Sequence, residues 1–437
     1  MSEYLQRRQT LFTQLEENSI VMIRSGEELI RNRDVEYPFR VNSDFFYLTG
    51  FEEPDATLVL SKNKGQQQTI IFVRPKDKKQ EIWQGRRLGV EASIASLGVD
   101  KSFSIASFDE EMAKLVLGVE SIYFSFTQLN QWSEIISSWI DTQKTKARQG
   151  ITPTHKLLDV DNLLHEARLI KSATEIEIMR QAAQISVQGH LAAMQLSGLK
   201  YEYQIQAQLE AVFKQAGASN VAFNSICASG ENACILHYTE NTAGLKDDAL
   251  ILVDAGAEYQ GYAGDISSTF PKSGKFTLAQ KQLYDLVLAA QQAVIALIKP
   301  NVNYDELHKC SVKVITQGLI DLGVLKGSLD NLIKEESYKK FFMHGTGHWL
   351  GMDVHDVGNY KINKQWRPLK AGMVLTVEPG IYISAQVGKE EGVNNKYWDI
   401  GIRIEDDVLV TETGSEVLTV GLPRTTQEIE AHLEQGK

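Results

Sequence analysis

The sequence predicts two domains, an α/β domain followed by an α+β domain. The chain has 437 residues, and domains usually contain about 150 residues, so two or three domains are expected. The first part alternates short apolar segments with charged helical patterns, whereas the second has long helices between strand-like segments. The apolar pattern weakens around residues 145–170, which we take as the linker. We therefore place the domains at residues 1–168 and 169–437.

Composition narrows the class of protein. Apolar residues make up 43% of the chain and charged residues 23%, which is typical of a globular protein and excludes disordered and fibrous classes. The 45 basic and 56 acidic side chains give a net charge of −11, whereas nucleic-acid-binding proteins usually have a basic excess. No basic run indicates a membrane surface, and no apolar stretch has the length of a spanning helix. We expect neither nucleic acid nor membrane as a partner.

The cysteines and the N-terminal residues bear on location. Cys227, Cys234 and Cys310 are too few, and odd in number, for a disulfide framework. The N-terminal residues contain no apolar segment of the kind found in a secretory signal. Because reduced cysteines are usual in the cytoplasm, we expect a cytoplasmic location.

The first domain is predicted from short apolar runs that read as strands. These runs lie at 19–23, 57–61, 68–73 and 121–125, with a helical pattern around 108–117. Two stretches that mix aromatic and polar residues, at 37–51 and 81–89, are unusual for a plain core.

The second domain is predicted from helix start signals. Ser172 and Glu175 form a capping-box pattern before one helix, and Thr277 and Gln280 form another. Further helices are expected from about 203 to 217 and after 303. Strand-like segments fill the gaps, at 222–229, 249–259, 262–270, 373–383 and 400–411. This pattern predicts antiparallel strands wrapped by helices.

The first candidate site is a pair of aspartates, Asp254 and Asp265, on either side of a predicted hairpin. We expect residues 260–261 to form its two-residue turn, so that Asp254 pairs with Ser267. Asp265 then shares the face of Asp254, at about 7–8 Å between Cα atoms. Two carboxylates at that separation can bind one metal ion. A solvated hairpin with incidental acids is the alternative.

The second candidate site is a glycine-rich segment with three histidines, His344, His348 and His355, within twelve residues. The glycines predict a loop rather than a helix. Histidine is the commonest metal ligand and a frequent proton carrier near neutral pH. The alternative is a turn with surface histidines.

Two further acids lie at predicted strand ends. Glu378 ends an apolar strand and precedes a proline, which requires a strand edge or a bulge. Arg403 and Glu405 share one face of the segment 400–411, because side chains alternate along a strand. A buried arginine beside a buried glutamate would orient it and offset its charge. An exposed strand end and a half-exposed strand are the respective alternatives.

Taken in order, these clusters resemble the metal ligands of the dinuclear metallopeptidases with the pita-bread fold. That family includes methionine aminopeptidase, aminopeptidase P, prolidase and the metal-free creatinase. The resemblance covers about residues 170–420 and identifies five ligands: Asp254, Asp265, His348, Glu378 and Glu405. It implies a pita-bread catalytic domain with a curved antiparallel sheet, preceded by an α/β domain of the creatinase/prolidase type.

This ligand set also has a chemical logic of its own. Four carboxylates can bind and bridge two divalent ions about 3.5–4 Å apart. An oxygen-rich site suits Mn²⁺ better than thiolate-selecting metals, so two Mn²⁺ ions are the expected cofactors. Two ions lower the pKa of a bridging water, and the resulting hydroxide can attack an amide carbonyl.

The resemblance implies roles for residues around the metals. Glu378 would bind metal and also take the proton of the nucleophile. His355 matches the histidine that contacts the scissile carbonyl oxygen or the developing oxyanion. His237 matches the substrate-side histidine, and His344 the third outer histidine.

Three more residues are candidates for supporting roles. The resemblance implies that Arg403 orients Glu405. Tyr382 and Asp353 are further candidates near the ligands, Tyr382 also for substrate binding.

Within the family, the first domain is similar to that of bacterial aminopeptidase P. The stretches YPFRVNSDFFYLTGFEEPDATLVL and EIWQGRRLG carry this similarity, together with HGTGHWLGMDVHDVG and GIRIEDD. It implies peptide substrates with proline in second position and release of the N-terminal residue. It also implies a homo-oligomer, dimer or tetramer, in which the first domain and a neighbouring subunit shape the pocket through Trp83 and Asp34.

Two alternatives are kept. A prolidase would cleave Xaa-Pro dipeptides and needs a stop that excludes longer chains. A non-catalytic binding module on the same fold would have no use for His237, His344 and His355.

Overall fold

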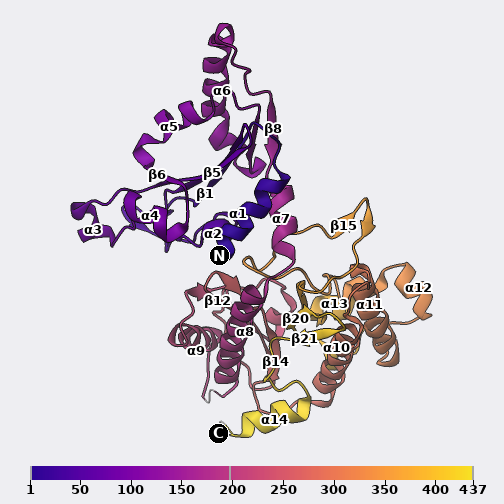
Figure 1. The fold of residues 1–437 in the computed structure, drawn as a ribbon. Helices are drawn as coiled ribbons and strands as arrows, with labels where there is room; N and C mark the ends of the chain where they lie inside the picture. The colour runs from indigo at the N-terminus through magenta and orange to yellow at the C-terminus, as the bar shows by residue number, and fades with distance from the viewer. Residues whose placement is uncertain (1, 196–197, 436–437) are drawn as a thin grey trace. The chain divides into compact units, whose positions relative to one another are not determined.

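The computed structural model describes residues 2–195 and 198–435 (Figure 1). The chain divides into two compact units, Met1–Ala167 and Arg168–Lys437. Among the described residues, we find no helix with the length and hydropathy needed to cross a bilayer.

The N-terminal domain contains a six-stranded mixed sheet in the order β6-β5-β4-β1-β7-β8. These strands are β1 (Ser19–Arg24), β4 (Thr57–Asn63), β5 (Gln66–Val73), β6 (Lys101–Ser104), β7 (Ser121–Phe124) and β8 (Lys156–Asp159). β4 is antiparallel to β1 and β5, and the other neighbouring strands are parallel. The four strands predicted for this domain are confirmed, each with a buried apolar run.

Helices and a small hairpin complete this domain. They are α1 (Glu3–Gln14), α2 (Ser43–Thr49), α3 (Lys78–Gln84), α4 (Val90–Leu97), α5 (Phe108–Leu115), α6 (Leu129–Thr145), α7 (Asp161–Leu169) and the hairpin β2 (Ile30–Asn32)–β3 (Val35–Glu36). Met112 of α5 and Trp139 of α6 pack against Ile20 and Phe72 of the sheet, so these two helices cover one face of it.

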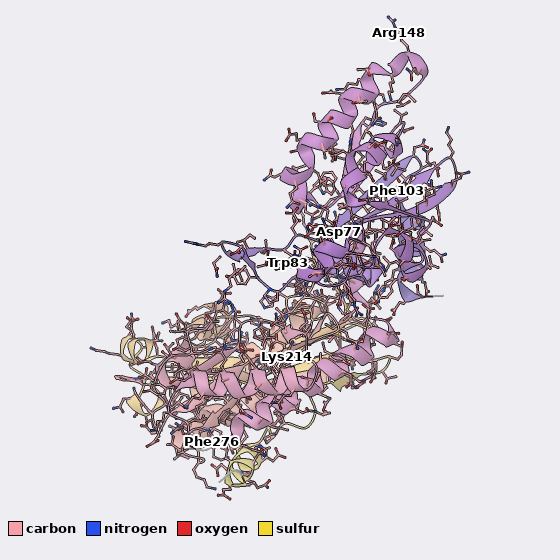
Figure 2. All side chains as sticks on the ribbon, turned by 90° about the vertical axis from the view of Figure 1, so that its left-hand side faces the viewer. Asp77, Trp83, Phe103, Arg148, Lys214 and Phe276 are labelled. Carbon is pink, nitrogen blue, oxygen red and sulfur yellow. The ribbon has the colours of Figure 1, made fainter. Side chains whose placement is uncertain are left out.

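The two stretches of aromatic and polar residues differ in burial. The first contains α2, whose Phe45, Phe46 and Leu48 are buried, so it belongs to the core after all. The second contains α3, where Trp83 is 86% exposed, and its side chain lies at the surface of the domain (Figure 2).

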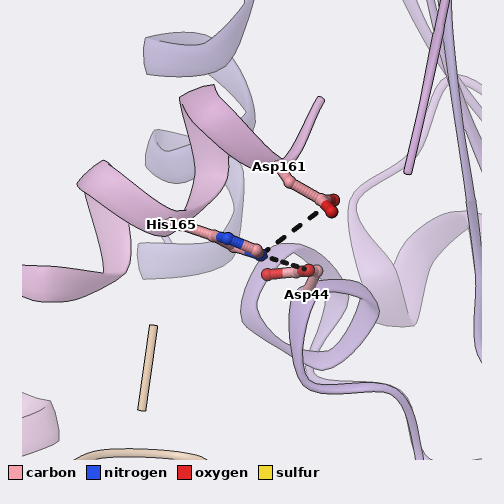
Figure 3. A group of neighbouring side chains, drawn as sticks. All are labelled: Asp44, Asp161 and His165. Atoms are coloured by element: carbon pink, nitrogen blue, oxygen red, sulfur yellow. Dashed lines mark ion pairs between the residues drawn. The ribbon is translucent and has the colours of Figure 1, made fainter. Parts of the chain in front are cut away.

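The expected linker is instead regular structure. β8 pairs with β7 at one edge of the sheet, and α7 follows it. The apolar pattern is weak there because β8 is an edge strand with exposed and half-exposed residues. His165 of α7 lies 3.5 Å from Asp44 of α2, a pair that connects the two helices, and 4.0 Å from Asp161 of its own helix (Figure 3).

The C-terminal domain has long helices around short antiparallel sheets. The helices are α8 (Ala173–Met194), α9 (Glu202–Gln215), α10 (Leu278–Leu297), α11 (Tyr304–Asp321), α12 (Leu329–Lys334), α13 (Ala385–Glu390) and α14 (Thr426–Gln435). Figure 1 shows strands lying between the α8–α9 pair and the α10–α11 pair. Leu209, Leu283 and Ile315 belong to the apolar core that joins helices to strands.

The hydrogen bonds of both predicted capping boxes are present in the structure. The Ser172 side chain accepts from the backbone N–H of Glu175, whose carboxylate accepts from the N–H of Ser172. Thr277 and Gln280 do the same for α10. Each box pairs N–H groups that a helix start otherwise leaves without partners.

The strands of this domain form several short sheets. They are β9 (Asn220–Val221), β10 (Ile226–Ser229), β11 (Leu250–Asp254), β12 (Ala257–Tyr259), β13 (Tyr262–Ala263), β14 (Ser267–Pro271), β15 (Lys361–Ile362), β16 (Gln365–Trp366), β17 (Val374–Val377), β18 (Gly380–Ile383), β19 (Ile400–Arg403), β20 (Asp406–Val410) and β21 (Ser415–Val417). Their pairings are antiparallel. An α/β domain followed by an α+β domain is therefore confirmed.

The predicted hairpin has the expected register. Tyr259 pairs with Tyr262, and Asp254 pairs with Ser267. Gln260 and Gly261 both have positive φ, 48° and 79°, as a two-residue turn of this type requires. This turn therefore brings Asp254, at the end of β11, beside the segment between β13 and β14 that contains Asp265.

Candidate metal centre

A cavity of about 450 Å³ lies within the C-terminal domain. Its lining includes every metal ligand and every histidine suggested by the sequence. The lining residues are Phe223, Asn224, Ile226, Leu236, His237, Thr239, Asp254, Asp265, His344, Gly345, Gly347, His348, Val354, His355, Glu378, Arg403 and Glu405. The four separate sequence clusters thus meet in one place.

The acidic side chains reach the cavity from strand ends. Asp254 ends β11, and Asp265 lies between β13 and β14. Glu378 directly follows β17, and Glu405 lies between β19 and β20. Irregular backbone at these points lets consecutive strands direct their carboxylates to a common centre.

The possible metal-ligand atoms lie close together but are not hydrogen-bonded to one another. Asp265, His348 and Glu405 each offer one ligand atom, and these atoms lie within 4.8 Å of one another. His348 Nε2 is 3.5 Å from Asp265 Oδ2 and 3.6 Å from Glu378 Oε1. These separations exceed hydrogen-bond lengths and are close to those between ligand atoms around one small cation.

Charge at the centre is poorly balanced. Burial, and then the charges of nearby carboxylates, hold the pKa values of Asp265 and Glu405 well above the usual range, although Arg403 opposes this. Burial also raises the pKa of Glu378, against His348 and Arg403. Among the described residues, Asp254 Oδ1 and Asp265 Oδ1 are buried without a hydrogen-bond partner. Clustered buried carboxylates of this kind fit divalent cations, which would offset their charge.

His348 has the hydrogen bond expected of a metal ligand. Its Nδ1 lies 3.0 Å from the carbonyl oxygen of Trp349. A carbonyl only accepts, so Nδ1 carries the proton and Nε2 presents its lone pair toward Asp265 and Glu378. Such a bond fixes the tautomer and ring orientation of metal-binding histidines.

Arg403 has different partners from those expected. It donates from Nη2 to Asp254 at 2.6 Å, rather than directly to Glu405. Its Nε donates to Ser267 Oγ at 2.9 Å, and that hydroxyl donates to Glu405 Oε2 at 2.7 Å. The reason is that β19 ends at Arg403, and Glu405 N–H then bonds to Ser267 O on β14. Arg403 therefore contacts one acid directly and Glu405 through Ser267.

The Arg403 guanidinium also begins a chain of hydrogen bonds to His344. Nη1 donates to the Tyr382 oxygen at 2.9 Å, and the Tyr382 hydroxyl lies 2.8 Å from His344 Nε2. His344 Nδ1 lies 2.7 Å from the carbonyl oxygen of Gly345. Burial lowers the pKa of His344 to about 3, so the ring is neutral at pH 7. Tyr382 therefore orients the arginine and a histidine without lining the cavity itself.

His355 and His237 also line the cavity. The rings of His355 and His348 meet edge-on, with centroids 4.3 Å apart. Burial, together with the charges of His348 and His237, lowers the pKa of His355. His237 is exposed in the segment after the short 3₁₀ helix Gly230–Cys234.

Asp353 and Asp356 fix the loop that carries His355. Arg168 Nη2 donates to Asp353 at 2.7 Å and to Asp356 at 2.6 Å, and Lys171 Nζ donates to Asp356 at 2.9 Å. The sequence suggested Asp353 but not Asp356, Arg168 or Lys171, because the partners lie 185 and 188 residues apart. Sequence reasoning also missed Asp407, whose Oδ2 accepts from the Asp265 N–H at 3.2 Å. The alternation that selected Arg403 and Glu405 extends to Asp407 and could have found it.

Two suggested pocket residues belong to the N-terminal domain. Asp34 lies between β2 and β3 and is exposed, as is Trp83 of α3. Neither is among the residues that line the cavity.

Comparison with known proteins decides the family. The description "Metallopeptidase family M24" matches residues 177–412, and "Aminopeptidase P, N-terminal domain" matches residues 4–123. The chain belongs to metallopeptidase family M24. Its C-terminal domain is the M24 domain, and the ligand-lined cavity lies within that domain.

Relatives in this family match the chain over its whole length. It is 43% identical to the Xaa-Pro aminopeptidase of Haemophilus influenzae over 98% of this chain and 96% of that one. An aminopeptidase structure from Pseudomonas aeruginosa is 45% identical, with a TM-score of 0.96 over 99% and 98% of the two chains. The Zn-substituted aminopeptidase P of Escherichia coli in complex with product is 41% identical, with a TM-score of 0.95 over 100% and 99%. The pita-bread M24 fold, preceded by an aminopeptidase P type N-terminal domain, is thus confirmed.

Proposed function

We propose that this M24 chain is an Xaa-Pro aminopeptidase, which hydrolyses the amide bond between an N-terminal residue and a proline in second position. The observation that carries the proposal is one cavity that unites four carboxylates, three of them buried, with His237, His344, His348 and His355. The choice of substrate rests on similarity to enzymes named Xaa-Pro aminopeptidase at 42–43% identity over 98% of this chain.

We propose that two divalent ions bind at this centre. The residues that would hold them are Asp254, Asp265, His348, Glu378 and Glu405. The unpartnered oxygens of Asp254 and Asp265 support this, because a buried acceptor without a donor calls for a cation. The oxygen-rich donor set favours Mn²⁺. When bound, such ions polarise a carbonyl group and acidify water.

The chain's own residues then divide the remaining work. Glu378 accepts the proton of the attacking water and passes it to the proline nitrogen, a role that suits a carboxylate whose pKa is raised by burial. His355 is neutral because its pKa is lowered, and it donates an N–H to the carbonyl oxygen as negative charge develops there. His237, which lines the same cavity, contacts the substrate. Arg403, Tyr382 and His344 hold the acids and each other in place.

The N-terminal domain is proposed to shape the substrate pocket in a homo-oligomer. Trp83 is 86% exposed and its neighbour Ile82 is 80% exposed, and exposed apolar side chains of this kind suit an interaction surface. We propose that Trp83 contacts the proline ring and that Asp34 holds a cationic group. The dimeric or tetrameric state and the cytoplasmic location stay predictions. Mass determination in solution, with Trp83→Ala as the variant, tests the first of them.

One experiment separates the candidate functions. A tripeptide Xaa-Pro-Yaa and a dipeptide Xaa-Pro are incubated with the protein, with Mn²⁺ and with chelator. Metal-dependent release of Xaa from the tripeptide, with the dipeptide a poor substrate, supports the aminopeptidase. Preference for the dipeptide indicates a prolidase. No cleavage of either, with metal bound stoichiometrically, indicates a binding module.

A further inference from the structure

One wall of the cavity is a single segment, residues 229–243, which carries His237. Leu236, His237 and Thr239 of this segment all line the cavity. Among the described residues, no hydrogen bond reaches the His237 ring, so the backbone around it must set its position.

A buried glutamate outside the cavity meets the segment at several points. Glu202 is the first residue of α9 and has no exposed surface. Its Oε1 accepts from the N–H and the hydroxyl of Ser229, at 2.8 and 3.0 Å, and from the amide of Asn232, at 3.0 Å. Its Oε2 accepts from the Tyr238 hydroxyl at 2.8 Å and the Ala243 N–H at 2.9 Å. These contacts lie before, beside and after His237 in the chain.

The five donors to Glu202 are all neutral groups. A buried carboxylate needs compensation, and here hydrogen bonds from one segment supply it where an ion pair usually would. The arrangement requires the segment to keep one conformation, because any shift withdraws several donors together. The Glu202 N–H also donates to the Ala243 carbonyl at 3.1 Å, which closes the segment at its far end.

Tyr238 connects this network to the cavity. It is 7% exposed, and its ring packs with Ile226 and Tyr382 in a small apolar cluster. The Tyr238 hydroxyl is held by Glu202, and the preceding residue, His237, lines the cavity. The hydrogen bond to Tyr238 therefore fixes the backbone directly beside His237.

We propose that Glu202 is a positioning residue that holds the segment 229–243 so that His237 presents its ring to the substrate. Nothing in the metal centre requires Glu202, and it does not line the cavity. The proposal deepens the proposed function and rests on it, since it assigns the substrate-side wall of the same site.

Glu202→Gln tests the proposal with the least change in volume. An amide has one accepting and one donating end, so in either orientation its NH₂ group meets a backbone N–H, that of Ser229 or of Ala243. One buried donor is then unpaired, which lowers the equilibrium constant for the ordered conformation of the segment by about tenfold or more. We expect kcat/KM for Xaa-Pro-Yaa to fall about tenfold, mainly through a higher KM, with metal content unchanged.

Glu210→Gln is the matched control on the same helix. Glu210 Oε1 accepts from the Ser225 hydroxyl at 2.8 Å and from the Gln206 amide at 2.9 Å. Both donors reach the same oxygen, so the carbonyl oxygen of a glutamine can accept both hydrogen bonds in the same position. We expect wild-type KM and kcat for this variant.

A double-mutant cycle with His237→Ala separates positioning from general stability. If Glu202 acts through His237, the variant E202Q/H237A has the same kcat/KM as H237A alone. Losses that multiply in the double variant, or an unchanged KM in E202Q, would overturn the proposal. If E202Q does not fold, Tyr238→Phe replaces it, because it removes one of the five hydrogen bonds and keeps the buried ring.

Hydrogen exchange provides a readout that does not depend on catalysis. We expect faster amide exchange in residues 229–243 of E202Q than in E210Q, with equal exchange in α10. Equal exchange in that segment would also overturn the proposal. A wild-type protein that cleaves no Xaa-Pro peptide refutes the proposed function instead, and the exchange result then decides the role of Glu202 alone.

Discussion

Two groups of buried carboxylates in the C-terminal domain have opposite charge balance. Asp356 is buried, yet Lys171 and Arg168 outweigh the effect of burial and lower its pKa. Asp265 and Glu405 are also buried, and burial first, then neighbouring acids that outnumber the one arginine beside them, raises their pKa values. The same residue types at the same depth thus have different tasks. Paired acids hold the fold together, and unpaired acids remain available to a cation.

The two groups are also joined along the chain. Asp356 follows His355 directly, and its N–H donates to the carbonyl of Trp349 at 2.9 Å. Asp356 with Lys171 and Arg168, the balanced group, therefore fixes the loop that carries His355. His355 in turn lines the cavity of the unbalanced group, which contains Asp265 and Glu405. Substituting acid by amide in each group tests whether charge balance explains the difference.

The largest effect is expected from Glu405→Gln in the unbalanced group. Loss of a carboxylate from a shared metal centre removes transition-state stabilisation of about 4 kcal/mol or more, a fall in kcat/KM of at least about a thousandfold. The metal content of the variant should be lower, and its circular dichroism should show that it is folded. Glu412→Gln, an exposed acid nearby in the chain, is the control. Full activity of E405Q would contradict both the centre and the function.

Asp356→Asn should produce the largest loss of stability. Removing one partner of a buried pair leaves cations uncompensated, at a cost of about 3–5 kcal/mol in the free energy of unfolding. Because the folded-state pKa of Asp356 is lowered, its contribution is present above the unfolded pKa, about 4. It is lost as pH falls through the folded-state value. Chemical denaturation of both proteins should therefore show a large difference at pH 7 that shrinks below pH 4. A constant difference would mean that packing, not charge, is responsible.

Metal removal should make stability depend on pH in the opposite direction. Asp265 and Glu405 have raised folded-state pKa values, so the folded chain without metal retains protons that the unfolded chain releases. Its stability is highest at acid pH and falls as pH rises through the folded-state values, by about 1.4 kcal/mol per pH unit and proton. Denaturation with chelator should show this fall, and saturating Mn²⁺ should abolish it, with proton release on binding. A flat profile with chelator would contradict the assigned charge imbalance.

The smallest effect, and the sharpest in sign, is expected from Asp265→Asn. It removes a buried carboxyl group that, without metal, must either stay ionised beside other acids or retain a proton, and it adds a donor near Glu378 and Glu405. The metal-free protein should therefore become more stable, by about 1 kcal/mol. Thermal unfolding with chelator measures this, with D356N as the matched acid-to-amide change of opposite sign. Destabilisation of metal-free D265N would remove the distinction between the two groups.

Local patterns in the sequence were sufficient for many features. The capping boxes at Ser172 and Thr277, and the hairpin register around residues 260–261, depend on residues close in the chain. The acids and histidines of the metal centre also fall in short local clusters, and the order of those clusters along the chain indicated the family. Each of these features is decided by a few neighbouring groups, so the pattern contains the information.

Other features depend on residues far apart and were not predictable. The partners of Asp356 come from a segment almost two hundred residues earlier, and Arg403 bonds Asp254 and Ser267 across strands. Strand β8 was read as linker because an edge strand lacks a continuous apolar run. Glu202 gave no signal, since a single acid at a helix start ordinarily reads as a favourable end charge.

The hairpin that connects Asp254 and Asp265 has a consequence for how the chain can vary in length. Side chains alternate along each strand, so the two aspartates face the same side only while the turn keeps its parity. One residue added at Gln260–Gly261 would rotate Asp265 away from Asp254 if the strand slipped to absorb it, whereas two added residues would preserve the facing. Insertions at this tip should therefore be tolerated when they add an even number of residues. The geometry of the two aspartates thus limits the length of a loop that is otherwise exposed.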